Sequence, residues 1–158
     1  MFKIVLQMPE SPTLRETEQP LETMSVDDLL WYFSGMINFC NASQEQSFLL
    51  IPETSLFSFL DDLSKVVQNF QLPNFTPEEM IEDLDGNFSL VFSVVNERIH
   101  IKDAFLESEF TVSKADFIFE SKSFILRSLK QIENLFPNLI KNPKYQQLAT
   151  DLEDRIRL

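Results

Sequence analysis

Carboxylates are the chemically active side chains that this sequence supplies in number. The chain of 158 residues has 25 Asp and Glu against 13 Lys and Arg, a formal net charge of −12. Residues 1–100 hold 16 acidic and 4 basic residues, whereas residues 101–158 hold 9 of each. A field of this sign repels nucleic acid and anionic membranes and attracts cationic partners. The composition therefore favours binding of a basic partner and predicts that the chain binds neither nucleic acid nor a membrane.

A tryptophan on the polar side of a predicted helix marks the surface on which we expect such a partner to bind. Trp31 lies about 200° around the helix axis from Leu29, close to Asp27 and Asp28, and tryptophan is favoured at interface hot spots. Each feature also has an alternative interpretation. Residues 9–24 could cover Trp31, and the acidic residues could serve only to keep the protein soluble. The predicted partner-binding residues are Asp27, Asp28, Trp31, Asp61, Asp62, Glu78, Glu79, Glu82, Asp83 and Asp85.

The sequence lacks the motifs of the common ligand and metal sites. Only two glycines are present, so phosphate-binding and dinucleotide-binding loops are absent. His100 and Cys40 are the only residues of their types, which is too few for a zinc site of nitrogen and sulfur ligands. Residues 83–94 begin like a calcium loop but have Phe88 and Val94 where glycine and glutamate are required. We therefore expect no metal and no cofactor.

No residue pattern indicates catalysis, so the chain is predicted not to be an enzyme. A catalytic pair of Cys40 and His100 stays open as an alternative, although no local sequence supports it. A single cysteine suits a reducing compartment, and no apolar run is long enough to span a membrane. These features predict a cytoplasmic protein.

Hydrophobic periodicity predicts one globular domain over residues 1–158, of the α+β class, with a mainly antiparallel sheet and four to five helices packed on it. Residues 9–24, with three prolines, are predicted to be irregular. The predicted strands cover residues 2–8, 47–51, 88–95 and 98–102. The predicted helices cover residues 25–40, 55–70 and 76–84, a stretch from Ser121 or Ser123 to 135, and a last segment capped by Asn142.

Residues 103–120 have two interpretations. We favour a second hairpin, with strands at 110–112 and 117–119 joined across 113–116. A helix over 104–120 is the alternative. The two arrangements expose different side chains, so the boundary between sheet and helix is open here.

The whole chain resembles bacterial toxin-immunity proteins, such as those of contact-dependent growth inhibition systems, in size, acidic charge and architecture. The architecture includes the hairpin-like FSLVFSVVNERIHIK at residues 88–102. The resemblance implies a toxin inhibitor, or antitoxin, that binds a cognate and often basic toxin domain and blocks its activity. It assigns no functional residue. The alternatives are an adaptor or structural subunit, an anti-defence protein that mimics nucleic acid, and a small enzyme that uses Asp or Glu.

Overall fold

Two antiparallel sheets and four α-helices make up the protein in a computed structural model that describes residues 2–8, 20–105 and 108–157. The first sheet has the strand order β1-β2-β3, and its strands are β1 (Phe2–Gln7), β2 (Ser34–Asn41) and β3 (Ser47–Ser55). The second has the order β4-β5-β6-β7, with β4 (Glu78–Glu82), β5 (Ser89–Val95), β6 (Arg98–Asp103) and β7 (Glu109–Ser113). The α+β class is confirmed, and the strands divide between two sheets.

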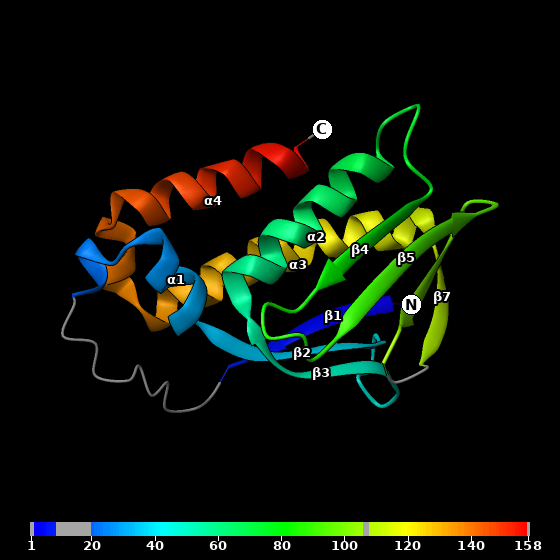
Figure 1. Cartoon of the computed structure of the whole chain (residues 1–158), viewed down its shortest axis with the longest axis horizontal. Coiled ribbons are helices and arrows are strands. Elements are labelled where there is room, and N and C mark those ends of the chain that lie inside the picture. The colour runs from blue at the N-terminus through cyan, green and yellow to red at the C-terminus, as the bar shows by residue number, and fades with distance from the viewer. Residues whose placement is uncertain (1, 9–19, 106–107, 158) are drawn as a thin grey trace.

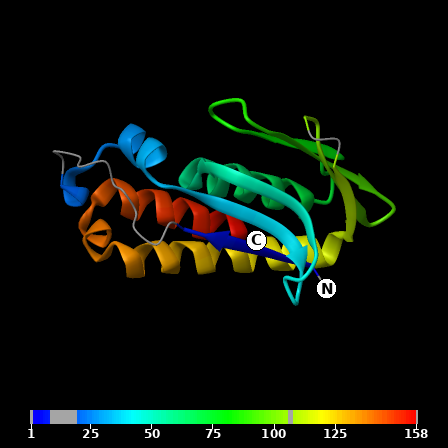
Figure 2. The ribbon, with the colours of Figure 1, turned by 90° about the horizontal axis from the view of Figure 1, so that it is seen from below.

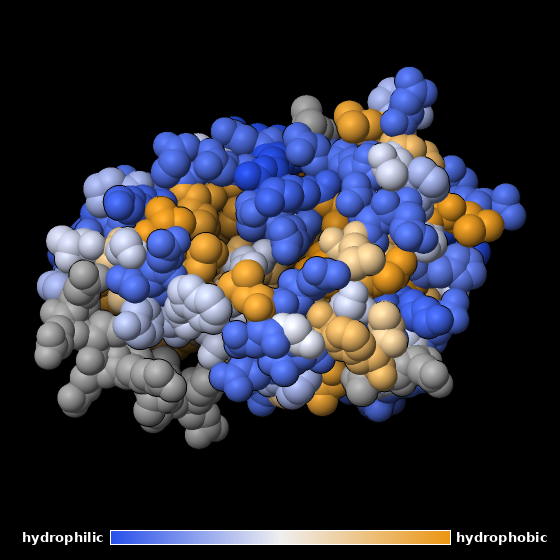
Figure 3. Space-filling model, in the orientation of Figure 1, coloured by the Kyte–Doolittle hydropathy of each residue, from blue (hydrophilic) through white to orange (hydrophobic). Residues whose placement is uncertain are grey.

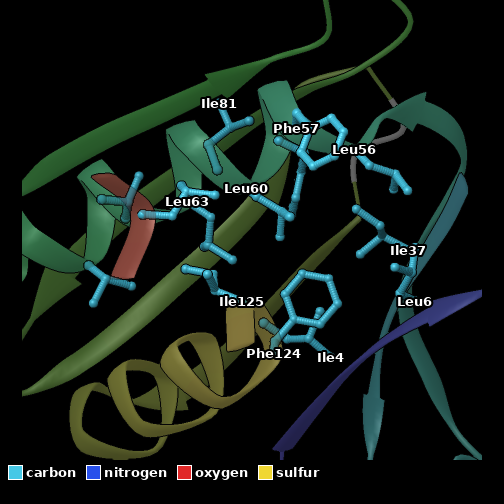
Figure 4. Close-up of a cluster of buried hydrophobic side chains, with 14 of the residues drawn as sticks. Ile4, Leu6, Ile37, Leu56, Phe57, Leu60, Leu63, Ile81, Phe124 and Ile125 are labelled. Atoms are coloured by element: carbon cyan, nitrogen blue, oxygen red, sulfur yellow. The ribbon is translucent and has the colours of Figure 1, made fainter. Parts of the chain in front are cut away.

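The helices join the two sheets around a shared core. They are α1 (Val26–Tyr32), α2 (Leu56–Phe70), α3 (Lys114–Leu135) and α4 (Pro143–Ile156), with short 3-10 helices η1 (Leu21–Thr23) and η2 (Pro137–Lys141). Helix α2 packs against α3, α4 and strands of both sheets (Figures 1 and 2). Figure 4 shows Ile4 and Ile37 of the first sheet and Ile81 of the second meeting Leu60 of α2 and Ile125 of α3.

Elements with strong local signals are confirmed. β1 alternates as expected, with Phe2, Ile4 and Leu6 buried. α2 spans the predicted helix from residue 56 to residue 70. The hairpin of β5 and β6 turns at Asn96 and Glu97, whose φ angles of 50° and 60° are the positive values that a two-residue hairpin turn requires.

The predicted helix over residues 25–40 is wrong beyond its first two turns. Ser25 caps α1, because its Oγ accepts a hydrogen bond of 3.2 Å from the backbone N of Asp28, but the helix ends at Tyr32. Residues 34–41 form β2, the middle strand of the first sheet. A Cβ on Gly35 would lie 3.0 Å from Leu6 Cδ1, so glycine permits this close strand packing. Pairing with two strands outweighs the helical periodicity.

Two further predictions are wrong. Residues 76–84 form no helix in the structure, because 78–82 pair with β5 as the edge strand β4.

The strand at 110–112 is confirmed within β7, but 117–119 belong to α3. That helix begins at Lys114, before the predicted start, because Ser113 Oγ accepts a hydrogen bond of 3.1 Å from the backbone N of Asp116. Of the irregular segment predicted over 9–24, residues 9–19 lie outside the described residues.

Side chains of α3 cover the open edge of β1. The Ile4 backbone N donates a hydrogen bond of 3.0 Å to Glu120 Oε1, and Arg127 Nη2 donates one of 3.0 Å to the Ile4 carbonyl. Arg127 also pairs with Glu120 at 2.6 Å. An uncovered strand edge is a site for unwanted pairing with other chains, and these contacts block it at Ile4.

Candidate functional site

A pocket beside Trp31 brings together three stretches of chain that are far apart in the sequence. Its walls come from the end of α1, the start of β2, the end of β3 and the turn between β4 and β5, which lies beside the end of β3 in Figure 1. The pocket has a volume of about 190 Å³. We call it the Trp31 pocket; the residues used below are Trp31, Glu53, Asp83, Leu84 and Asp85.

The β4–β5 turn is held in shape by one of its own carboxylates. Asp83 Oδ2 accepts hydrogen bonds from the backbone N of Asn87 at 3.1 Å and from Asn87 Nδ2 at 2.9 Å. Asp83 Oδ1 accepts a third, at 3.3 Å, from Thr54 Oγ1 of β3, which ties the two sheets together. Gly86 has a φ of 73°, a conformation that glycine adopts without strain. These hydrogen bonds fix the Asp83 carboxylate at the pocket, and the turn places the exposed Asp85 beside it.

The carboxylates of the Trp31 pocket have no cationic partner among the described residues. Glu53, Asp83 and Asp85 form no ion pair there, and Glu53 Oε1 accepts a 3.5 Å hydrogen bond from Ser34 Oγ. Three negative charges at one small pocket attract a positive group strongly, since their fields add.

The indole of Trp31 completes the pocket and is open to solvent. Trp31 is 60% exposed, so the described part of the chain leaves it uncovered, and Leu84 beside it is 48% exposed. An ammonium or guanidinium group over an indole face gains roughly 0.5–2 kcal/mol. The arrangement suits one positively charged side chain, with the carboxylates around it and the ring against it.

Of the ten predicted residues, the structure brings Trp31, Asp83 and Asp85 together at this pocket. Asp27 is exposed one helical turn before Trp31, while Asp28 is partly buried. Glu78, Glu79 and Glu82 lie on the edge strand β4, where Glu78 and Glu82 are exposed and Glu79 is partly buried.

Asp61 and Asp62 lie on α2 and are held by cations of the protein itself. Lys65 Nζ lies 2.6 Å from Asp61 and 3.7 Å from Asp62, and Arg155 of α4 also pairs with Asp61. Burial favours a higher pKa for Asp61, but the hydrogen bonds from Lys65 and Arg155 outweigh it and hold the pKa below its usual value. For Asp62, burial prevails and raises the pKa. Asp61 in particular is already engaged within the fold.

Glu53 was missed by the sequence reasoning. The predicted strand stopped before Pro52, but β3 continues through this proline to Ser55. An edge strand tolerates proline because one side of it needs no ladder hydrogen bond. No local signal marks Glu53, since its neighbours at the pocket are Trp31 and Asp83, 22 and 30 residues away.

The open alternative of a Cys40–His100 pair gains no support. Cys40 is buried in β2, where burial raises its pKa, and its thiol lies 3.7 Å from the carbonyl of Lys3. His100 lies in the other sheet, with its Nδ1 3.3 Å from Thr111 Oγ1 and 3.6 Å from Glu109. The two side chains therefore have separate partners on separate sheets.

Comparison with known protein families, curated proteins and solved structures gives no match for this chain. Among the described helices, none has the length and apolar character needed to cross a membrane. Within residues 2–8, 20–105 and 108–157, no group of three His, Cys, Asp or Glu side chains is placed to hold a metal ion. The functional inference therefore depends on the geometry and charge of the Trp31 pocket.

Proposed function

We propose that this protein is an inhibitor of the immunity type, which binds a basic toxin domain through an acidic surface centred on the Trp31 pocket. The observation that carries the proposal is the exposed indole of Trp31 beside three carboxylates that have no cationic partner in the described chain. Asp27 and Glu82, both exposed, extend the negative surface from α1 and β4. The partner is a protein, and the binding needs no cofactor.

The size of the pocket favours a side chain as its occupant. Its volume of about 190 Å³ lies below the roughly 300–1,000 Å³ of typical small-molecule sites. An arginine or lysine on a partner's surface presents a compact charge on a long stem and fits this chemistry. Arginine matches best because its planar group both stacks on an indole and pairs with carboxylates.

The protein would inhibit such a toxin by covering the cationic residues with which the toxin binds its substrate. A nuclease binds its phosphate substrate with Lys and Arg side chains, so an inhibitor that engages those cations blocks substrate access. Long-range attraction between the opposite surfaces would also accelerate association, up to roughly 10⁸–10⁹ M⁻¹s⁻¹ at low salt. A cytoplasmic location suits this role and the single free cysteine, Cys40.

Fluorescence of Trp31, the only tryptophan of the chain, tests the pocket directly. We expect an octa-arginine peptide, but not an octa-glutamate peptide, to change its emission at low salt. Asp85→Asn should weaken binding at least about fivefold, whereas Asp154→Asn, an exposed acid on α4, should leave it within about twofold. Equal loss in both variants would mean that only net charge matters and would contradict the proposal.

A second experiment tests the biological role. We expect a reading frame beside this gene to encode a basic protein whose expression stops growth, and this protein to restore growth. Trp31→Ala should weaken that complex at least about tenfold, measured by calorimetry, with the fold retained by circular dichroism. An unchanged affinity, or an association rate that does not fall with added salt, would count against the Trp31 pocket as the docking site.

A further inference from the structure

A second depression lies on the other side of α1, between α1, α2 and α4. Its volume is about 410 Å³, within the roughly 300–1,000 Å³ range of small-molecule sites. Val26 and Leu30 of α1 and Leu148 of α4 line it, and we call it the apolar groove. Figure 3 shows apolar surface in the hollow between α4 and α1.

The lining of the apolar groove leaves hydrophobic surface in contact with water. Val26 is 42% exposed, and Leu30 and Leu148 are only partly buried, with their inner sides against the core. Covering such surface gains about 25 cal/mol for each Å² removed from water. The groove therefore favours a ligand with an apolar body.

The charged groups at the groove are engaged, with one exception. Asp61 and Arg155 pair with each other, and Arg155 also donates to Ser64 Oγ at 3.0 Å. Asp151 accepts a hydrogen bond of 2.8 Å from Gln147 Nε2. Lys144 lines the groove, and among the described residues no carboxylate lies within ion-pair distance of its Nζ.

The position of Lys144 gives the groove one positive end. Lys144 is the second residue of α4, where the helix dipole adds positive potential. Asp151 follows seven residues later, which is about 10 Å along the helix axis and close to one Debye length at physiological salt. Salt therefore weakens the repulsion between Asp151 and a negative group beside Lys144.

From this apolar lining and its unpaired ammonium, we propose that the groove binds a small amphiphile with one carboxylate, such as a medium-chain fatty acid. The carboxylate pairs with Lys144, and the alkyl chain lies over Leu30 and Leu148. This inference does not depend on the proposed function, because the groove and the Trp31 pocket share no residue.

Calorimetry with decanoate, below the concentration at which it forms micelles, tests the proposal on the full chain. We expect saturable binding of one decanoate, and weaker or no binding of decanol and of decyltrimethylammonium. Lys144→Gln should weaken decanoate binding at least about fivefold, while Lys141→Gln, which removes the same charge outside the groove, should change it less than about twofold.

Two more variants separate the two parts of the recognition. Lys144→Glu should abolish decanoate binding and create binding of decyltrimethylammonium, because the sign of the end charge is reversed. Ser58→Leu, which fills the groove from α2, should block decanoate with no change in the circular dichroism spectrum. The proposal is overturned if decanoate binds equally to wild type and Lys144→Gln, if it still binds Ser58→Leu, or if no saturable binding occurs.

Discussion

Two pairs of acidic residues, Asp61 with Asp62 and Asp83 with Asp85, look alike in the sequence and differ in the folded protein. Lys65 contacts both members of the first pair, and Arg155 joins Asp61 from α4. The second pair forms no ion pair within the described chain and lies at a pocket beside an exposed tryptophan. Net charge therefore overstates the charge available to a partner, because part of it is already bound inside the protein.

Glu120 extends this comparison to an acid that the fold uses. It is 8% exposed, accepts a hydrogen bond from the Ile4 backbone N and pairs with Arg127. The three groups form a series: a buried acid with two partners, a partly buried ion pair, and two acids with no cationic partner among the described residues, of which Asp83 is partly buried and Asp85 is exposed. Substitution of the buried Glu120 should therefore reduce stability most, and substitution of the exposed Asp85 should reduce stability least but weaken partner binding.

The largest loss of stability is expected for Glu120→Ala. The substitution leaves the Ile4 N–H and the Arg127 guanidinium without their acceptor and uncovers the edge of β1, so unfolding should become easier by about 2 kcal/mol or more. Urea denaturation measures this change. Glu120→Gln keeps an acceptor oxygen and should lose less. Equal losses would show that the hydrogen bond to Ile4 contributes little.

A smaller loss, about 1 kcal/mol at pH 7, is expected for Asp61→Asn because the pair with Arg155 is only partly buried. The pKa of Asp61 is lowered in the folded protein, so its ionised form stabilises the fold above the pKa of the unfolded chain. This contribution disappears as the pH falls through the folded pKa. Urea denaturation from pH 7 to pH 2 should show wild type and variant converging, and a constant difference would contradict the ion-pair explanation.

The neighbouring Asp62→Asn should have the opposite sign. Burial raises the pKa of Asp62, so its ionised form costs free energy in the folded protein at neutral pH. We expect unchanged stability or a gain of up to about 0.5 kcal/mol at pH 7, with no gain below the pKa of the unfolded carboxyl. The same urea series measures it. A clear loss at pH 7 would mean that the Lys65 contact outweighs burial.

The smallest change in stability is expected for Asp85→Asn, within about 0.5 kcal/mol of wild type, because Asp85 is exposed and has no cationic partner among the described residues. The same variant should show the fivefold loss of octa-arginine affinity described above. Thermal denaturation beside the fluorescence titration separates the two effects. A marked fall in melting temperature would show that Asp85 stabilises the fold and would contradict this prediction.

Parts of the fold follow from local sequence. Asn142 was predicted to cap the last helix, and its Oδ1 accepts hydrogen bonds from the backbone N of Lys144 at 2.9 Å and of Tyr145 at 3.3 Å. The hairpin turn at 96–97 and the apolar stripe of α2 are equally local. Such signals act between residues a few positions apart, so they are readable without knowledge of the rest of the chain.

The wrong predictions share one physical cause. Phe33, Ile37 and Cys40 fit a helical stripe, but Phe33, Ile37 and Phe39 fit the alternation of a strand just as well. Residues 34–41 form a strand because they pair with β1 and β3, whose residues lie elsewhere in the chain. Residues 78–82 were decided in the same way, by pairing with β5.

By itself, the sequence determined the negative charge, the α+β class and the outward position of Trp31 on its helix. Tertiary structure alone decided that Glu53 joins Asp83 and Asp85 beside that ring, and that Arg155 holds Asp61. The reason is physical: net charge and helical faces depend on composition and near neighbours, whereas ion pairing and pocket walls depend on which distant segments the core brings together.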